Sequence, residues 1–310
     1  MIRQKLQRAA MKWRLRKETE LIEPLLILGE GRSGSTLLMQ LLATSSQIAF
    51  DRIYPFEIRY LTYLLHWASL IGKPCQMEAD WTPANVFDPS GARIGPLPYA
   101  NTQLWDGQEL WPRCFRAVWR EFSNVTVAQM DVKIKKKRDF GAPVLYYAEK
   151  TPFWMPERLR LVMPYKAIIL IRDPRDIFLS ITAFNKKRGF SAFSRFDHED
   201  DWAFARRFVK LYKQNSRIIR KEEAASHSLL IKYEQLALNL DEETRRLGQW
   251  LGVELNAGRV KKQIRHFAHH MTSSSPAQSV ERWRHEMAPE MTEFFQKELR
   301  KELRHFGYDA

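Results

Sequence analysis

The sequence has little cysteine and no long apolar run. Cys75 and Cys114 are the only cysteines among 310 residues, and neither stands at a spacing typical of a zinc site. Two cysteines cannot build the disulfide framework of a small secreted protein. No stretch of about 18 uncharged apolar residues could span a bilayer, and the N-terminus lacks the apolar core of a signal peptide. These absences predict a cytoplasmic protein without a metal site.

Acidic residues are too few to balance the basic ones. The sequence has 36 Asp+Glu against 50 Lys+Arg, a formal charge of +14, and its 45% share of hydrophobic residues is typical of a chain that buries a core. Such a charge fits nucleic acid, an anionic membrane surface or a small polyanionic ligand as partner. Residues 1–20 form a basic N-terminal extension that could contact a membrane, although a solvated segment is the simpler interpretation.

Short apolar runs recur along the chain and predict buried strands over residues 25–29, 144–148, 167–171 and 229–233. Helical patterns lie between them, over residues 35–42, 176–187, 201–225 and 241–251, and a last helix is expected after Pro289. Strands that alternate with helices form parallel sheets. We therefore expect a single α/β domain over residues 21–310, with a central parallel sheet flanked by helices and with residues 55–140 inserted over the sheet.

The first predicted strand runs into a glycine-rich turn, Gly29-Glu30-Gly31-Arg32-Ser33-Gly34-Ser35-Thr36, which leads into the first helix. Backbone N–H groups and a helix N-terminus converge there on a point that favours an anion, which predicts a P-loop-like domain. The three glycines match a dinucleotide pattern, with Asp51 about 20 residues further on, and this would indicate an NAD(P)-dependent dehydrogenase. A nucleotide triphosphate-binding loop would need lysine directly after the last glycine. Ser35 stands there, so this interpretation fails.

A third interpretation of the turn uses its cation and its hydroxyls. The run Arg32-Ser33-Gly34-Ser35-Thr36-Leu37-Leu38 resembles the 5′-phosphosulfate-binding loop of sulfotransferases that use 3′-phosphoadenosine 5′-phosphosulfate, PAPS. In that family a lysine or arginine precedes Ser-Gly-(Ser/Thr)-Thr and two leucines. The resemblance implies that PAPS is the co-substrate and that its 5′ end is bound by Gly31, Arg32, Ser33, Gly34, Ser35 and Thr36.

A second strand–turn–helix segment, around Arg172-Asp173-Pro174-Arg175-Asp176, resembles the part of these enzymes that binds the 3′-phosphate. In the family a serine follows the strand-end arginine after eight residues, and Ser180 stands at that distance from Arg172. The resemblance implies that Arg172 and Ser180 bind this phosphate. An Arg–Asp pair that caps the helix is the alternative for this segment.

Three shorter segments carry the same resemblance. The stretch Ile231-Lys232-Tyr233-Glu234-Gln235-Leu236, followed by a helix, resembles a late strand and helix of these enzymes, in which Tyr-Glu is mostly structural. Glu149-Lys150-Thr151 is similar to a segment of the glycan and bacterial branches and places a lysine at a strand end. The stretch Ser279 to Arg284 resembles the C-terminal segment that closes over the cofactor, which implies contacts from Arg282 and Trp283. The Arg-Lys-Gly stretch of the cytosolic branch is absent here, so the choice between Arg282 and Arg284 stays open.

The resemblance implies an in-line transfer in which cations do most of the work and no metal is needed. We expect Arg32 and Lys150 to stabilise the charge that develops. Glu57 is the expected general base, because some branches place a catalytic glutamate after the first helix with an arginine two residues on, which makes Arg59 an acceptor-binding residue. Glu149 is the rival base. In a further alternative, Glu57 and Arg59 form only a surface or acceptor-binding pair.

The expected acceptor is a hydroxyl-bearing molecule. A carbohydrate is the leading hypothesis, because aromatic rings of the inserted region could stack on sugars or else form core: Trp67, Trp81, Tyr99, Trp105, Trp111 and Trp119. A peptide tyrosine, a lipid or a small alcohol stays open. A basic nucleic-acid-binding protein would explain the charge, but the sequence contains no recognised reader motif, so nucleic acid is not the expected partner.

Overall fold

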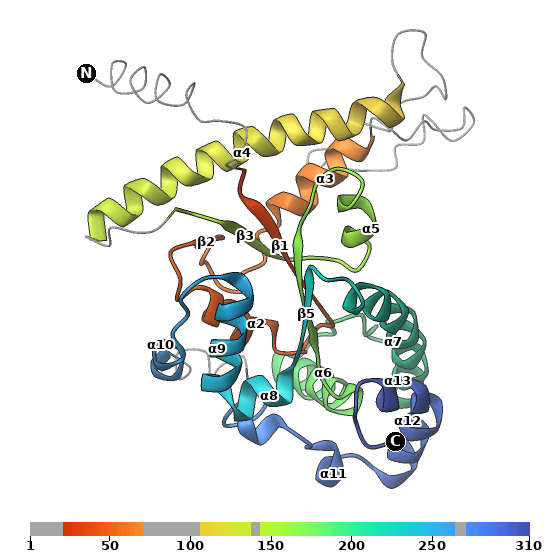
Figure 1. Ribbon diagram of the computed structural model, residues 1–310. Coiled ribbons are helices and arrows are strands. Elements are labelled where there is room, and N and C mark those ends of the chain that lie inside the picture. Colours follow the sequence, from red (N-terminus) through yellow and green to blue (C-terminus); the bar gives the residue numbers. More distant parts are fainter. Residues whose placement is uncertain (1–20, 71–105, 138–142, 264–270) are drawn as a thin grey trace, which may run out of the picture.

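The computed structural model describes residues 21–70, 106–137, 143–263 and 271–310. Its centre is a sheet of five parallel strands in the order β2-β3-β1-β4-β5 (Figure 1). The strands are β1 (Glu23–Gly29), β2 (Ile48–Ala49), β3 (Tyr146–Lys150), β4 (Lys166–Ile171) and β5 (Ser228–Lys232). The four apolar runs are thus confirmed as strands. The sequence prediction missed β2, which has only two residues and therefore no pattern.

Helices cover both faces of this sheet, so the predicted α/β architecture is confirmed. Their bounds are α2 (Ser35–Leu42), α3 (Tyr60–Leu70), α4 (Gly107–Lys137), α5 (Met155–Leu159), α6 (Pro174–Arg188), α7 (Asp201–Glu223), α8 (Tyr233–Leu238), α9 (Leu240–Leu251), α10 (Ala257–Gln263), α11 (Trp283–Glu286), α12 (Pro289–Glu298) and α13 (Arg300–His305). The helix expected after Pro289 is interrupted, because the backbone leaves helical geometry at Leu299.

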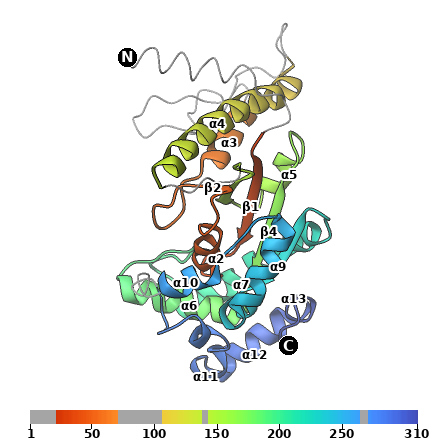
Figure 2. The same ribbon diagram turned by 60° about the vertical axis from the view of Figure 1, so that its left-hand side comes forward.

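Alternate residues of each strand face opposite helical layers, as the period of two in a strand requires. Leu25 and Ile27 of β1 belong to the cluster that packs on α2, α8, α9 and α10. Leu26 and Leu28 belong to the cluster that packs on α3, α4, α5 and α7. In Figure 2, α4 lies in the upper part of the view, and α9 and α10 lie in the lower part. Burial on both faces explains why these strands read as continuous apolar runs.

The inserted region supplies core as well as surface. Trp111 and Trp119 of α4 are 4% and 1% exposed and pack with Phe115 against one face of the sheet. These two tryptophans are therefore core residues. Trp67 of α3 is 46% exposed. Trp81, Tyr99 and Trp105 lie outside the described residues, and so does the basic extension 1–20 with its predicted membrane contact. Within the described ranges, none of the helices combines the length and apolar character that crossing a bilayer requires.

Candidate functional site

The glycine-rich turn lies at the edge of the sheet where the parallel strands end. Gly34 has φ 97°, a left-handed conformation that favours glycine, and a Cβ atom there would come within 2.2 Å of Cδ2 of Tyr233. Tyr233 directly follows β5, so the close approach joins the turn after β1 to the end of β5. Arg32 is also left-handed, with φ 68°. The turn is therefore shaped for close packing and leads straight into α2.

Arg172 is the centre of the polar contacts at this edge. It follows β4, is 4% exposed, and donates hydrogen bonds to the main-chain oxygens of Arg32 at 3.0 Å and Ser279 at 2.6 Å. Its guanidinium carbon lies 4.5 Å from the centroid of the Tyr233 ring. Within the described residues its Nε atom makes no hydrogen bond, and neither does the buried hydroxyl of Ser33. A buried donor without a partner requires an explanation, and beside a cavity a bound anion would provide one.

Arg32 and Ser180 also meet at this edge of the sheet. The Nε atom of Arg32 donates a hydrogen bond to the Ser180 hydroxyl at 3.2 Å, and that hydroxyl lies 3.4 Å from the one of Thr272. Burial lowers the pKa of Arg32 to about 10, and the neighbouring charge of Arg172 adds to this shift. Arg32 therefore stays cationic at neutral pH.

These residues line one cavity of about 120 Å³, together with others the sequence analysis did not select. The predicted residues in its wall are Arg32, Gly34, Ser35, Thr36, Arg172 and Ser180, and the additional ones include Gln40, Tyr233, Thr272 and Ser279. Gly31 and Ser33 belong to the same turn without lining the cavity. The sequence signal that could have found Tyr233 is its position directly after a parallel strand, since all such strands end at this edge.

The C-terminal segment reaches the cavity through Ser279 and Arg282. Arg282 donates to the Thr272 hydroxyl at 3.1 Å and forms an ion pair with Glu286. The side chain of Trp283 does not line the cavity, because it packs against the Arg175 guanidinium. The guanidinium carbon of Arg175 lies 3.5 Å from the centroid of the Trp283 ring. The structure thus brings Arg282 beside the cavity but leaves Trp283 behind its wall. Arg284 pairs with Glu281 and Asp309 at the surface.

The turn after β4 caps helix α6 and also supplies a residue of the cavity wall. Asp173 accepts the backbone N–H of Arg175 at the start of α6 and forms an ion pair with the Arg175 side chain at 2.7 Å. Asp176 accepts the backbone N–H of Trp283 at 2.9 Å. The capping interpretation is therefore right for Asp173 and Arg175, while Arg172 of the same segment faces the cavity.

Lys150 and Glu57 lie close together beyond the end of β3. The Nζ atom of Lys150 lies 3.6 Å from a carboxylate oxygen of Glu57 and donates to the main-chain oxygen of Pro55 at 2.8 Å. Burial lowers the pKa of Lys150, and the charge of Glu57 opposes that shift. The Glu57 side chain is 46% exposed, so an incoming molecule can reach it. Arg59 is exposed two residues further on.

Glu149 has a different environment from Glu57. It is 2% exposed, and its carboxylate accepts hydrogen bonds from the backbone of Leu61 and Thr62, from the Thr62 hydroxyl and from Tyr147. These contacts bind it to the first turn of α3, where a carboxylate stabilises a helix. Burial raises its pKa above the ordinary value. The arrangement favours a structural role for Glu149, whereas the Glu57 carboxylate is accessible.

The dehydrogenase interpretation does not fit the topology. In a dinucleotide fold the second strand lies beside the first, so that an acidic residue at its end reaches the ribose. Here β3 lies between β1 and β2, and Asp51 after β2 accepts the backbone N–H of Ile53 in a turn. Across the described part of the chain, no three residues of the metal-binding types gather into a site for an ion.

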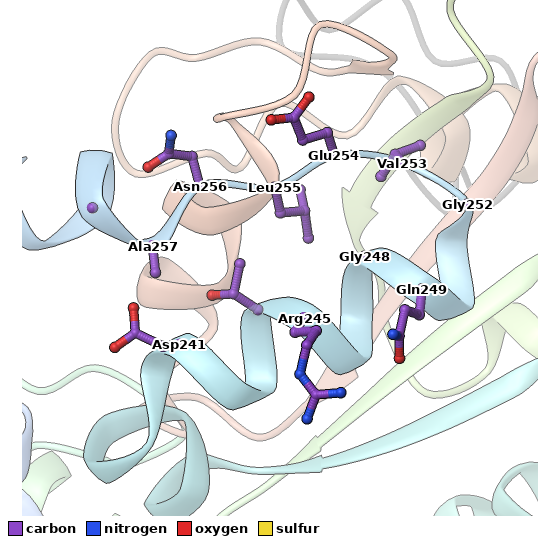
Figure 3. Close-up of a pocket in the computed structure, with 12 residues that line it drawn as sticks. Asp241, Arg245, Gly248, Gln249, Gly252, Val253, Glu254, Leu255, Asn256 and Ala257 are labelled. Atoms are coloured by element: carbon purple, nitrogen blue, oxygen red, sulfur yellow. The ribbon is translucent and has the colours of Figure 1, made fainter.

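A larger hollow lies elsewhere on the molecule. This groove of about 570 Å³ lies between α9 and the segment 252–258. Figure 3 shows the residues that line it. None of the predicted site residues lines it. Size alone therefore does not identify the site, and the convergence of charged groups at the sheet edge is the more specific feature.

Comparison with known proteins identifies the family of this chain. A family model described as "Sulfotransferase family" matches residues 24–257. No curated protein matches the chain. Among solved structures, the sulfotransferase domain from the curacin biosynthetic pathway shares 15% identity with a TM-score of 0.50, over 94% of this chain and 100% of that one. The sulfotransferase domain from the Synechococcus PCC 7002 olefin synthase shares 16% identity with a TM-score of 0.47, over 95% and 98%.

At such identities the structural likeness concerns the fold, a parallel sheet with flanking helices. The matched region of the family model, in contrast, covers most of the chain, including the glycine-rich turn, Lys150, Arg172 and Tyr233. The chain therefore belongs to the sulfotransferase family, and it is a sulfotransferase enzyme.

Proposed function

We propose that the protein transfers the sulfuryl group of PAPS to a hydroxyl group of its acceptor. The observation that carries this proposal is the convergence of Arg32, Arg172 and Ser180 on one cavity. The hydroxyl of Ser33 and the Nε of Arg172, both without a partner among the described residues, support an anionic ligand at this place, because both are buried hydrogen-bond donors. PAPS, when bound, supplies the reactive sulfuryl group and carries phosphate at both ends of its ribose.

Each group has a defined part in holding this donor. The turn Gly31 to Thr36 and the N-terminus of α2 bind the 5′ end, since helix N-termini attract anions. Arg172 and Ser180 bind the 3′-phosphate. Arg282 closes the C-terminal side, a role supported by its hydrogen bond to Thr272 in the cavity wall.

The chemistry needs cations at the reacting end and a base for the acceptor. Arg32 and Lys150 stabilise the negative charge that accumulates on oxygen during an in-line transfer. Glu57 removes the proton of the acceptor hydroxyl, and its exposure and its 3.6 Å distance from Lys150 support this role. Arg59, exposed two residues on, orients the acceptor.

For the acceptor we propose a carbohydrate. Trp67 supports this class, because its exposed ring lies on α3, the helix that begins three residues after Glu57. Trp111 and Trp119 give no such support, since both are core residues. Incubation of the enzyme with PAPS and a panel of glycans, tyrosine peptides, lipid alcohols and small alcohols tests the class. We expect release of the desulfated product only in the reactions that contain glycans. Release only with another acceptor class contradicts the carbohydrate proposal.

Calorimetric titration with 3′-phosphoadenosine 5′-phosphate, PAP, tests the donor. Wild type should bind in the micromolar range, and Ser180→Ala should weaken binding about tenfold, or 1.4 kcal/mol. Ser216→Ala is a matched control, because Ser216 is buried on α7, its hydroxyl has no partner in the described part of the chain, and it does not line the cavity. Absence of PAP binding by folded wild type, or binding of NADPH instead, contradicts the proposal.

A further inference from the structure

The connection between α6 and α7 holds two consecutive residues in a rarely populated conformation. Phe193 and Ser194 have φ values of 55° and 64°, which non-glycine residues seldom adopt. Neighbouring side chains hold this geometry: Asn185 donates to the Ala192 oxygen at 3.1 Å, and Arg207 donates to the Ser194 oxygen. Such backbone strain persists only where the surroundings enforce it, and it is frequent at functional sites.

The strained segment places the Phe193 ring against the glycine-rich turn. A Cβ atom on Gly31 would come within 2.6 Å of Cδ1 of Phe193, so the ring lies directly on the turn. The ring centroids of Phe193 and Phe184 of α6 are 5.5 Å apart, and the planes of the two rings meet at 68°. Phe184 and Phe193 form a pair, here called the aromatic clamp, next to the side chain of Arg32.

The aromatic clamp contacts the Arg32 guanidinium. The guanidinium carbon of Arg32 lies 4.3 Å from the Phe184 ring centroid and 5.7 Å from the Phe193 ring centroid, and both distances are within the range of a cation–π interaction. Arg32 needs such support, because Arg172 places a second positive charge beside it and burial removes hydration. The negative ring faces offset both effects, while the bond to Ser180 sets the direction of the side chain.

We propose that Phe184 and Phe193 are positioning residues that hold the Arg32 guanidinium in place for donor binding. The inference rests on the proposed function, in which Arg32 contacts PAPS. Neither ring lines the cavity, so both act through Arg32. A free arginine at this position would turn toward solvent and would have to be reordered each time the donor binds.

A double-mutant cycle with PAP titration tests the aromatic clamp. Phe184→Leu and Phe193→Leu keep apolar volume but remove the ring, and each should weaken PAP binding roughly three- to tenfold, the range of cation–π contributions. In an Arg32→Ala background the same substitutions should cause no further loss, because the group they position is gone. Phe190→Leu is the matched control: this ring belongs to the same connection, is 51% exposed and stacks on Arg188 at 4.8 Å. It should leave affinity unchanged.

The outcomes separate the two proposals. Full PAP affinity in both single variants, or losses that add to that of Arg32→Ala, overturns the aromatic clamp while wild-type binding leaves the donor assignment intact. Failure of folded wild type to bind PAP overturns both. Phe193 is 37% exposed, so Phe193→Leu decides the question even where the buried Phe184→Leu variant does not fold. Phe193→Tyr retains the ring and should restore affinity.

Discussion

The guanidinium of Arg172 donates a hydrogen bond to the main-chain oxygen of Arg32 at 3.0 Å. This contact joins the end of β4 to the turn after β1, two segments that are 140 residues apart in the chain. A second bond, to the Ser279 oxygen at 2.6 Å, adds the C-terminal segment. Arg172 therefore holds three parts of the site together and still has Nε without a partner among the described residues.

Arg172→Lys should weaken PAP binding at least tenfold, although the charge is kept. The three donors of lysine share one nitrogen, so they cannot reproduce the planar fork in which separate nitrogens of Arg172 reach the oxygens of Arg32 and Ser279. The free energy of unfolding should fall by about 2 kcal/mol, the range for hydrogen bonds from charged groups. Titration and urea denaturation measure the two effects. Arg217→Lys, an exposed change on α7, is the control and should alter neither quantity. Unchanged PAP affinity in Arg172→Lys contradicts the assignment.

Gly34→Ala should destabilise the protein more than Gly189→Ala. Both glycines have positive φ values, 97° and 73°, so alanine costs about 1 kcal/mol of backbone strain at either position. At Gly34 the new methyl group would also meet the Tyr233 ring at 2.2 Å, whereas no atom lies within 4 Å of the equivalent position at Gly189. Urea denaturation gives the difference, and PAP titration should show a loss only for Gly34→Ala. Equal destabilisation would contradict the close packing of the turn on Tyr233.

Asp176 should make stability depend on pH in a defined window. Burial raises its pKa from 3.8 to about 6, so the folded state holds a proton that the unfolded state has released between these values. This contribution is present below pH 3.8 and is lost as the pH rises to 6, by at most about 3 kcal/mol. Asp176→Asn keeps an oxygen for the Trp283 N–H but cannot ionise.

The measurement for Asp176 is urea denaturation of both proteins between pH 4 and pH 8. Because only the wild type loses this contribution, its free energy of unfolding relative to Asp176→Asn should fall from pH 4 to about pH 6 and then stay level. A difference that does not change with pH, or that changes in the opposite direction, would show that Asp176 ionises normally.

Glu57→Gln and Glu149→Gln should separate the accessible carboxylate from the structural one. Glu57 is 46% exposed, so its replacement should change the free energy of unfolding by less than about 0.5 kcal/mol. Glu149→Gln should cost about 2–4 kcal/mol, because the carboxylate accepts three bonds from Leu61 and Thr62 that an amide group cannot fully replace. Thermal or urea denaturation measures both. A stable Glu149→Gln protein would return Glu149 as a candidate base.

The sequence by itself determined four of the strands and the main polar groups of the cavity. Apolar runs bounded by glycine or charge marked four strands, since a strand buried on both faces has no polar residues to interrupt it. The glycine-rich turn and the pair Arg172 and Ser180 were identified because they are local patterns with fixed spacing. Parallel strands then bring their ends to one edge, so these residues line one cavity.

Only the tertiary structure decided which residues meet from distant parts of the chain. Trp283 and Glu149 have motif positions like those of ligand-binding residues, yet Trp283 packs under Arg175 and Glu149 caps α3. Conversely, the motif at Tyr233 predicted a structural residue, yet Tyr233 lines the cavity. No motif marked the aromatic clamp at Arg32. The physical reason is that side-chain packing and hydrogen bonding depend on three-dimensional proximity, whereas sequence patterns report the backbone conformation of one segment at a time.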